Sequence, residues 1–429
     1  MIGFFWFFYE LGDVVRILVS AFAIRPNVGS EHGVGWNWVV ELAKDGHSVD
    51  ILTDTSRVLD VERGILKLGL ERVRVHGYRP ICLRFVPLRA GTAQLLYSAW
   101  QYGLFFYARA LHLKFSFDVA IHATYGVFRT PSFLGLLGIP FIFGPVGGAE
   151  DAPWKLKKPL PISSKLFECL RAIANRLSWF NPFLHLSWLS ATLILAKTQQ
   201  TKLFLPPYAR AKTEVYPEIG INFDVDARLF ELSERIASNV IDILYVGRLL
   251  GWKGGYLVID AFARILDIYP KARLTIVGDG SEGEWLKMRA QSLGIDESIS
   301  WIPHLPQADL FGIYRRCNCF LFPSLHDSSG NVVLEAMSFG LPVVCLDLGG
   351  PATLVDSSCS IVVPVKNLSS EDIAKKLAES VVSIYSNEES RLVMSKSAIL
   401  RAHAFTWKGR VIGALNLLQS KMLRGPHEL

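Results

Sequence analysis

Short apolar runs alternate with helical stretches along this chain, and the alternation begins twice. In the first half, a β-rich run at 16–23 leads through a glycine-containing loop into 36–46, where apolar residues recur at helical spacing, and then into a predicted strand at 47–54. Strands that alternate with helices form parallel sheets whose two faces are both covered. The first half is therefore predicted to be a doubly wound α/β domain.

The alternation stops in a polar stretch at 218–240 and restarts with the apolar run at 241–249. A chain of 429 residues is also long for one ordinary domain. We expect two Rossmann-like domains at 1–220 and 221–404, and a C-terminal helical segment at 405–429 that packs back across the seam between them. Ligands of such sheets bind beyond the carboxyl ends of the strands, so the two domains are expected to face each other across a cleft. Further strands are predicted at 117–124, 139–148, 192–196, 212–217, 272–280, 298–303, 317–324, 341–347 and 360–364.

Composition narrows the class of protein. Half of the residues are hydrophobic and 20% are charged, so the chain can bury large cores and does not have the composition of a disordered protein. The cysteines lack paired CxxC spacing and neighbouring histidines, which argues against a zinc site and favours a reducing, cytoplasmic compartment. The six cysteines are Cys82, Cys169, Cys317, Cys319, Cys345 and Cys359.

The positive charge is concentrated in the first half of the chain. The net charge is +6, which divides into +8 for 1–222 and −2 for 223–429. Much of the excess lies in 57–89 and 155–165. A solvated protein surface is the leading explanation, and contact with an anionic membrane or a polyanionic substrate is the alternative. Aromatic residues at 100–106 add to the membrane alternative.

One apolar run raises the question of a membrane span. Residues 177–196 carry no formal charge, but Asn181, Pro182 and His185 interrupt the run, and its end has the pattern of a short buried strand. A buried segment is therefore favoured over a spanning helix. The apolar stretch at 95–113 is likewise predicted to be a buried or interfacial helix.

The glycine loop at 28–35 precedes a predicted helix. Its amides could approach a phosphate at the helix N-terminus, which gives Gly29 a candidate role in donor binding. A glycine turn needed only for tight packing explains the sequence equally well.

A histidine and a tyrosine stand near the end of the predicted strand at 117–124. This position is expected to place His122 and Tyr125 at the edge of the cleft, where a histidine could bond a sugar hydroxyl or the leaving group. A hydrogen-bonded structural histidine is the alternative.

Two cations follow the first strand of the second half. Arg248 and Lys253 stand five positions apart, a spacing suited to gripping a diphosphate from a loop and a first helical turn. The segment is not a Walker A loop, because Trp252 and Gly254 flank the lysine.

Two further motifs have structural explanations. Residues 278–283 match GxGxxG, but no acidic residue ends the next predicted strand, so nicotinamide or flavin binding is disfavoured. The acidic residues at 224–226 lie in the polar linker, where a solvated turn is the simpler interpretation.

The segment 323–343 carries the most specific constellation. A predicted strand delivers a loop of small residues, the loop opens a helix, and Asp327 and Glu335 stand eight positions apart. Amides at this helix start can receive a diphosphate, while the two carboxylates accept hydrogen bonds from hydroxyl groups. A helix cap followed by a surface glutamate is the alternative. The loop residues assigned to donor binding are Ser328, Ser329, Gly330 and Asn331.

Together these motifs resemble the family 4 retaining glycosyltransferases, which are nucleotide-sugar transferases of the GT-B fold with an E-x7-E motif. The resemblance covers nearly the whole chain and is to the type found in bacterial polysaccharide assembly. It implies that Arg248 and Lys253 grip the donor diphosphate, Glu335 binds the ribose and Asp327 holds the donor sugar. Aspartate stands where the family has glutamate and reaches one methylene less. His122 lies near the family's active-site histidine in the sequence, so the resemblance gives it a catalytic role.

The implied reaction moves a hexose from a nucleoside diphosphate sugar to a hydroxyl of a glycan or lipid-linked acceptor, with retention at the anomeric carbon. No cofactor and no nucleic acid partner are expected. No metal is expected either, because the cations and helix N-termini stabilise the diphosphate in its place. The implied process is the biosynthesis of cell-surface polysaccharide. The protein itself is expected in the cytoplasm, with peripheral contact at the anionic inner face of the membrane. The alternatives are a sugar-nucleotide epimerase on the same fold and a non-catalytic nucleotide-binding or membrane-scaffolding protein.

Overall fold

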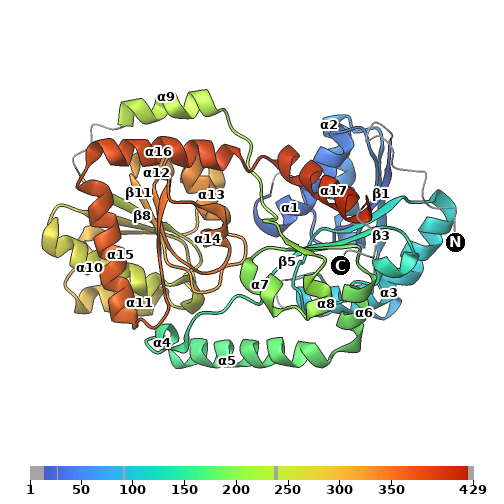
Figure 1. The fold of residues 1–429 in the computed structure, drawn as a ribbon, viewed down its shortest axis with the longest axis horizontal. Helices are drawn as coiled ribbons and strands as arrows, with labels where there is room; N and C mark the ends of the chain where they lie inside the picture. Colours follow the sequence, from blue (N-terminus) through green and yellow to red (C-terminus); the bar gives the residue numbers. More distant parts are fainter. Residues whose placement is uncertain (1–13, 27, 90–91, 236–239, 424–429) are drawn as a thin grey trace. The chain divides into compact units, whose positions relative to one another are not determined.

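The computed structural model of the chain describes residues 14–26, 28–89, 92–235 and 240–423 (Figure 1). Its contacts divide the chain into two compact units, each built around one parallel sheet. Unit 1 takes its described residues from 1–149, 175–218 and 407–429, and unit 2 takes its described residues from 150–174 and 219–406.

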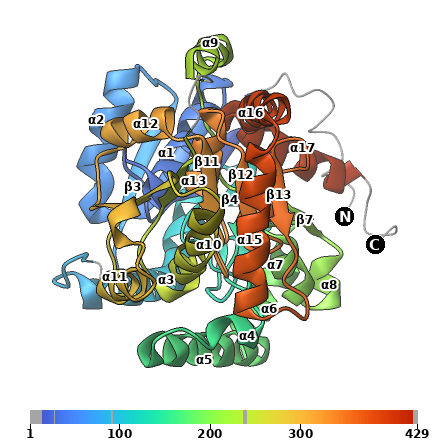
Figure 2. The same cartoon turned by 90° about the vertical axis from the view of Figure 1, so that its left-hand side faces the viewer.

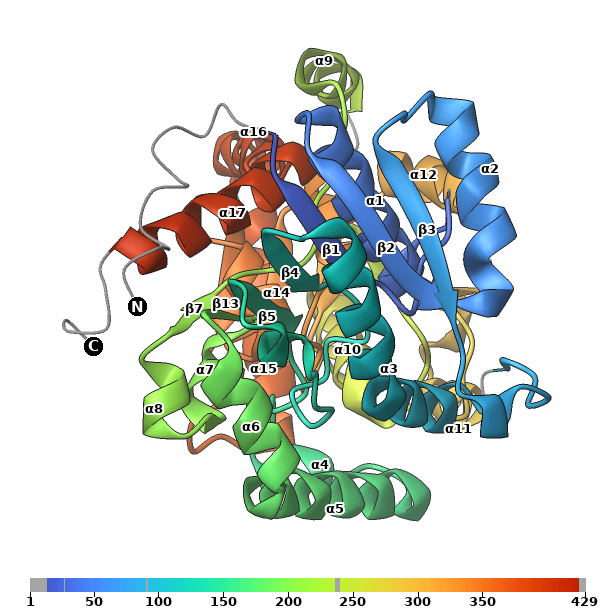
Figure 3. The same ribbon diagram turned by 90° about the vertical axis from the view of Figure 1, so that its right-hand side faces the viewer.

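The sheet of unit 1 is parallel throughout, with the strand order β3-β2-β1-β4-β5-β6-β7. Figure 3 shows β1, β2 and β3 side by side. The central strands are buried along almost their whole length, as expected for a sheet covered on both faces. The strands are β1 (Arg16–Ser20), β2 (Ser48–Asp54), β3 (Val73–Tyr78), β4 (Val119–His122), β5 (Phe141–Val146), β6 (Leu193–Ala196) and β7 (Thr213–Val215).

Helix α3 supplies much of the aromatic core of unit 1. Its residues Tyr97, Trp100 and Leu104 pack with strand residues such as Leu18 and Phe141. Trp100 is fully buried and donates its Nε1–H to the Tyr78 carbonyl at 2.8 Å, so this aromatic residue does not face a membrane. The helices are α1 (Ser30–Lys44), α2 (Val58–Leu68), α3 (Ala93–Phe115), α6 (Pro182–Ser190), α7 (Gln199–Phe204), α8 (Pro207–Arg210) and α17 (Trp407–Leu423).

The sheet of unit 2 is also parallel, with the strand order β10-β9-β8-β11-β12-β13. The central position of β8 and β11 matters for the site, because adjacent parallel strands deliver their following loops to the same edge of the sheet. The strands are β8 (Asp242–Val246), β9 (Arg273–Val277), β10 (Ile299–Ile302), β11 (Cys319–Phe322), β12 (Val343–Leu346) and β13 (Ser360–Val363).

Helices cover this second sheet, and Figure 2 shows two of them, α10 and α15, packed against each other. Helix α15 begins with a capping box, in which Ser369 and Asp372 satisfy each other's backbone amides. The helices are α4 (Trp154–Lys157), α5 (Ile162–Leu177), α9 (Val225–Arg235), α10 (Gly255–Ile268), α11 (Gly283–Ser292), α12 (Gln307–Arg316), α13 (Asn331–Ser338), α14 (Gly349–Leu354), α15 (Ser370–Tyr385) and α16 (Glu388–His403).

The path of the chain is more complex than two consecutive domains. Residues 150–174 lie in the first half of the sequence but belong to unit 2. Helix α17 lies at the end of the second half but belongs to unit 1, where it packs on α1. The division near 218 lies close to the boundary expected from the polar linker.

None of the described helices is long and apolar enough to cross a membrane. The uncharged run at 177–196 is divided among the end of α5, a 3-10 turn at Ser178–Phe180, α6 and β6. Asn181 ends the turn and caps α6 by accepting the Phe183 amide at 3.0 Å, which explains why the run is not one helix.

Candidate active site

The predicted site residues of unit 2 lie on two neighbouring loops. One loop follows β8 and leads into α10, and the other follows β11 and leads into α13. The Trp252 carbonyl joins them by accepting the Leu325 amide at 2.7 Å and the Ser324 hydroxyl at 3.1 Å. Gly254 has φ of 71°, and a Cβ there would lie 2.0 Å from the Pro323 carbonyl oxygen. A glycine at this position therefore permits the close approach of the two loops.

This approach brings Lys253 and Asp327 together. Their Nζ and Oδ2 atoms are 2.5 Å apart, and both side chains are largely buried. Burial alone would raise the pKa of the Asp327 carboxyl, but the Lys253 ammonium holds that pKa below its ordinary value. Asp327 is therefore an ionised carboxylate next to a cation, at the edge of the sheet where the sequence predicted it.

Arg248 lies on the same loop as Lys253 and is exposed. Its guanidinium carbon lies 5.7 Å from the centroid of the Trp252 ring. A guanidinium that is exposed yet positioned over a ring is available to a diphosphate. The grip of Arg248 and Lys253 on a donor stays a prediction.

Glu335 occupies the second turn of α13. Its Oε2 accepts the Tyr314 hydroxyl at 3.1 Å, and its Oε1 accepts the Gln307 amide at 3.0 Å. Burial raises the pKa of the Glu335 carboxyl. Both partners come from α12, and sequence reasoning missed them, because neither residue belongs to a recognisable motif.

The small-residue loop between the carboxylates opens α13 as predicted. Gly330 has φ of 75° and stands at the N-cap, while the Ser329 amide donates to Asp327 at 3.3 Å. The start of α14, which follows β12, also contacts Asp327, whose carbonyl accepts the Gly350 amide at 2.7 Å. The α13 N-terminus therefore carries backbone amides next to the Lys253–Asp327 pair, and the assignment of the loop to donor binding stays a prediction.

Sequence reasoning missed a buried cluster supplied by α5. Glu168 is 2% exposed and lies 2.7 Å from His326 Nε2, 2.9 Å from Lys157 Nζ and 3.2 Å from Arg171 Nη2. Burial favours the neutral acid, but His326, followed by the two cations, brings the pKa of the Glu168 carboxyl far below its ordinary value. His326 directly precedes Asp327, so this cluster holds the start of the loop that is predicted to bind the donor.

Aromatic stacking extends the same contact. The Trp252 ring stacks on Phe167, with the ring centroids 5.4 Å apart, and on His326, at 5.3 Å, and it is nearly parallel to both. Helix α5 therefore touches both loops of the predicted site. Nothing in the local sequence indicates this, because Glu168 and His326 are 158 positions apart.

In unit 1, His122 ends β4 but does not lie at an exposed edge. The ring is 1% exposed, and its Nε2 lies 3.1 Å from the Tyr97 hydroxyl. Burial lowers the pKa of His122 to about 4, so the ring is neutral at pH 7. The aromatic core around Tyr97 and Phe143 encloses the ring, which agrees with the alternative interpretation of a hydrogen-bonded structural histidine. Its catalytic role stays a prediction.

The glycines of the loop at 28–35 in unit 1 differ in how closely their surroundings pack against them. A Cβ on Gly33 would lie 2.3 Å from the Val28 carbonyl oxygen, and one on Gly35 would lie 2.7 Å from both Ala23 and Thr124 atoms. Packing therefore explains these two glycines. Gly29, in contrast, stands at the N-cap of α1 with no atom within 4 Å of an added Cβ, and its role in donor binding stays a prediction.

Known sequences match the second half of the chain, which contains the predicted residues Arg248, Lys253, Asp327 and Glu335. Residues 230–401 match the model of the family described as Glycosyl transferases group 1. A D-inositol 3-phosphate glycosyltransferase of Corynebacterium jeikeium is 32% identical over 171 residues, which cover 38% of this chain and 40% of that protein. The corresponding protein of Kribbella flavida is 31% identical over 216 residues, which cover 46% of this chain and 48% of that protein. The chain therefore matches less than half of the length of these curated relatives.

Solved structures are similar over almost the whole chain. Sucrose-phosphate synthase from Thermosynechococcus elongatus has a TM-score of 0.64 at 17% identity and covers 96% of this chain and 100% of that structure. HepE from Anabaena in complex with UDP has a TM-score of 0.59 at 16% identity, with 95% and 100% coverage. The chain has the GT-B fold. Its two Rossmann-like units are those expected from the sequence. The residues that match the group 1 family include Arg248, Lys253, Asp327 and Glu335.

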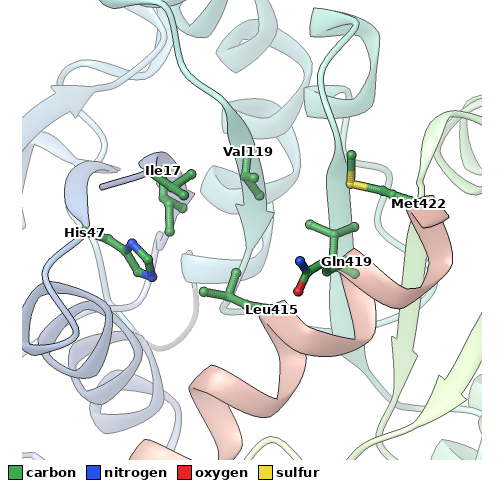
Figure 4. Close-up of a pocket in the computed structure, with 8 residues that line it drawn as sticks. Ile17, His47, Val119, Leu415, Gln419 and Met422 are labelled. Carbon is green, nitrogen blue, oxygen red and sulfur yellow. The ribbon is translucent and has the colours of Figure 1, made fainter. Parts of the chain in front are cut away.

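A small cavity in unit 1 of this GT-B chain lies away from the predicted chemistry. Figure 4 shows Ile17, His47 and Val119 facing Leu415 and Gln419 of α17 across it. The cavity lies at the amino-terminal side of β1 and β4, whereas ligands of doubly wound sheets bind at the carboxyl ends. We therefore interpret it as a packing gap beneath α17.

Proposed function

We propose that this protein is a retaining glycosyltransferase that moves a hexose from a nucleoside diphosphate sugar to a hydroxyl of a glycan or lipid-linked acceptor. The observation that carries the proposal is the Lys253–Asp327 pair next to the α13 N-terminus, within the part of the chain that matches the group 1 family. The pair combines a cation suited to a diphosphate with a carboxylate suited to sugar hydroxyls.

The proposed chemistry is mainly electrostatic. As the bond from the anomeric carbon to the diphosphate breaks, negative charge grows on the leaving diphosphate, and Lys253, Arg248 and the amides at the start of α13 stabilise it. Glu335 accepts hydrogen bonds from the ribose, and Asp327 orients the donor sugar. The mechanism assigns no metal, because the cations occupy that role. His122, which is neutral, is proposed to bond a hydroxyl after a local opening of its aromatic enclosure.

The proposed setting is the synthesis of cell-surface polysaccharide, at the cytoplasmic face of the membrane. The positive first half of the sequence supports peripheral contact with anionic lipid, where a lipid-linked acceptor is found. The names of the similar proteins suggest which substrates to try first. HepE has been solved with UDP and with UDP-glucose, and the curated relatives are D-inositol 3-phosphate glycosyltransferases.

A donor and acceptor panel tests the proposal. Purified protein is incubated with nucleoside diphosphate sugars, beginning with UDP-glucose, and nucleotide release is followed with and without lipid-linked glycans or inositol phosphate. We expect release that requires both a donor and an acceptor, together with a glycosylated product that retains the anomeric configuration. Release without any acceptor would instead favour the epimerase. Binding without release would favour the non-catalytic protein.

A further inference from the structure

Helix α5 carries a continuous apolar stripe on its exposed side. Ile162, Leu166, Leu170 and Ile173 follow each other at intervals of four, four and three residues, which places them on one face of a helix. Their exposed fractions are 83%, 59%, 58% and 52%. In Figures 1, 2 and 3 no described helix or strand of unit 2 is drawn against the outer side of α5. The stripe is therefore a surface of unit 2 and not part of its core.

The opposite face of α5 explains why the stripe cannot turn inward. Phe167 stacks on Trp252, Glu168 is bonded to His326, and the Ser164 hydroxyl donates to Glu282. These contacts include a buried carboxylate in an ion cluster, which is costly to break. The rotation of the helix about its axis is therefore fixed, and the apolar residues stay on the outside.

The charged side chains of α5 that lie beside the stripe have one sign. Lys165 and the exposed Arg176 lie along the same flank of it, and the exposed Lys158 precedes the helix. The helix contains a single acidic residue, Glu168, which is buried and bonded to His326, Lys157 and Arg171. The outer side of α5 is therefore apolar along its centre and cationic along its flank, the pattern of helices that lie in a membrane interface.

We propose that α5 docks unit 2 on an anionic lipid surface. The four stripe residues enter the boundary between headgroups and acyl chains, and Lys165 and Arg176 contact anionic headgroups. A second copy of the chain is the less suitable occupant, since a symmetric contact would bring together two cationic helices that expose no carboxylate. The inference extends the membrane contact of the proposed function to a specific surface, and it rests on that function only for its biological setting.

A fluorescent probe on α5 tests the docking directly. Cys169 is exposed between Leu166 and Leu170, and Cys82 is the other exposed cysteine among the described residues. In a Cys82→Ser protein, a polarity-sensitive dye on Cys169 should shift to the blue with anionic phosphatidylglycerol vesicles and not with neutral phosphatidylcholine vesicles. The shift should weaken as salt rises.

Substitutions separate the apolar and the electrostatic contributions. Leu166→Gln with Leu170→Gln should lower the fraction that pellets with anionic vesicles about tenfold or more, because two exposed leucines lose their contact with lipid. Val393→Gln with Leu400→Gln in α16, where the side chains are 58% and 57% exposed, is the matched control and should pellet as wild type. Lys165→Gln and Arg176→Gln should each lower anionic binding about fivefold.

Three outcomes would overturn the docking proposal. These are an unshifted Cys169 probe, equal pelleting with neutral and anionic vesicles, and a dye shift that appears without lipid at concentrations where the protein dimerises. The Leu166→Gln/Leu170→Gln protein should keep the wild-type melting temperature, and with a water-soluble acceptor it should keep wild-type turnover. An inactive protein that still binds vesicles contradicts the proposed function alone, and an active protein that does not bind contradicts the docking alone.

Discussion

Glu168 Oε1 lies 2.7 Å from His326 Nε2, although the two residues are 158 positions apart in the chain. The contact joins α5 to the residue that directly precedes Asp327. Through it, a segment that is early in the sequence holds the start of the predicted donor loop in unit 2. Glu168 is thus a positioning residue for the proposed reaction, and it touches no proposed substrate.

The Glu168→Gln variant should lower the free energy of unfolding of unit 2 by about 3 kcal/mol at pH 7, because it leaves buried cations without their carboxylate. The depressed pKa of Glu168 means that this stabilisation is present above the ordinary pKa of a glutamate and is lost as pH falls toward the folded value. Denaturant titrations between pH 7 and pH 3 measure it. The variant should lose less stability on acidification than wild type does. Glu371→Gln, at an exposed ion pair, is the control and should change little.

Removing the cations should impair turnover. Lys253→Ala and Arg248→Ala should each lower kcat/KM by an amount that corresponds to about 1.5–3 kcal/mol, since each removes a charge-assisted contact to the leaving diphosphate. Steady-state kinetics with the donor identified by the panel measure the effect. The exposed Lys271→Ala serves as the control for the loss of a positive charge. Wild-type efficiency in both site variants would remove the diphosphate assignment.

The two carboxylates should have separable roles. Glu335→Gln should weaken binding of the bare nucleoside diphosphate, because Glu335 is assigned to the ribose, whereas Asp327→Asn should spare that binding and impair transfer. Calorimetric titration of the nucleotide against both variants distinguishes the roles. An equal loss of affinity in the two proteins contradicts the division.

His122 should make unit 1 sensitive to acid. Its pKa is lowered to about 4 by burial, so between pH 6.5 and pH 4 the unfolded chain binds a proton that the folded unit does not. The free energy of unfolding of unit 1 should therefore decrease as the pH is lowered through this window, by about 3 kcal/mol at pH 4. A His122→Gln protein should lose this part of the pH dependence in denaturant titrations. The same variant tests the proposed catalytic role, because a purely structural histidine would leave kcat at pH 7.5 unchanged.

The part of the site that the sequence predicted depends on local patterns. Arg248 and Lys253 follow one strand, and Asp327 and Glu335 follow another, so the expected parallel sheet was enough to bring their loops to one edge. The strand adjacency of β8 and β11 completes the arrangement. The small-residue loop also opens α13, as its glycine and its position after a strand indicated.

The missed features depend on contacts between distant segments. No periodicity or motif shows that 150–174 packs with unit 2, because its partners Trp252 and His326 are far along the chain. A hydrogen-bonded structural His122 was only the alternative interpretation for the same reason, since α3 supplies the tyrosine that covers it. The end of a predicted strand indicates at which edge of the sheet a residue lies. The packing of other elements determines whether its side chain reaches solvent.

The passage of the chain between its two units has a practical consequence for chimaeras. An exchange with a relative of the half that is proposed to bind the nucleotide sugar would naturally be cut at the ends of the group 1 match, 230–401. Such a transplant leaves α5 behind, so Trp252 loses its Phe167 face and His326 loses Glu168. A cut at 220 likewise deprives the first unit of α17. A graft intended to change donor preference should therefore carry residues 150–174 with it, as a second insert from the same parent.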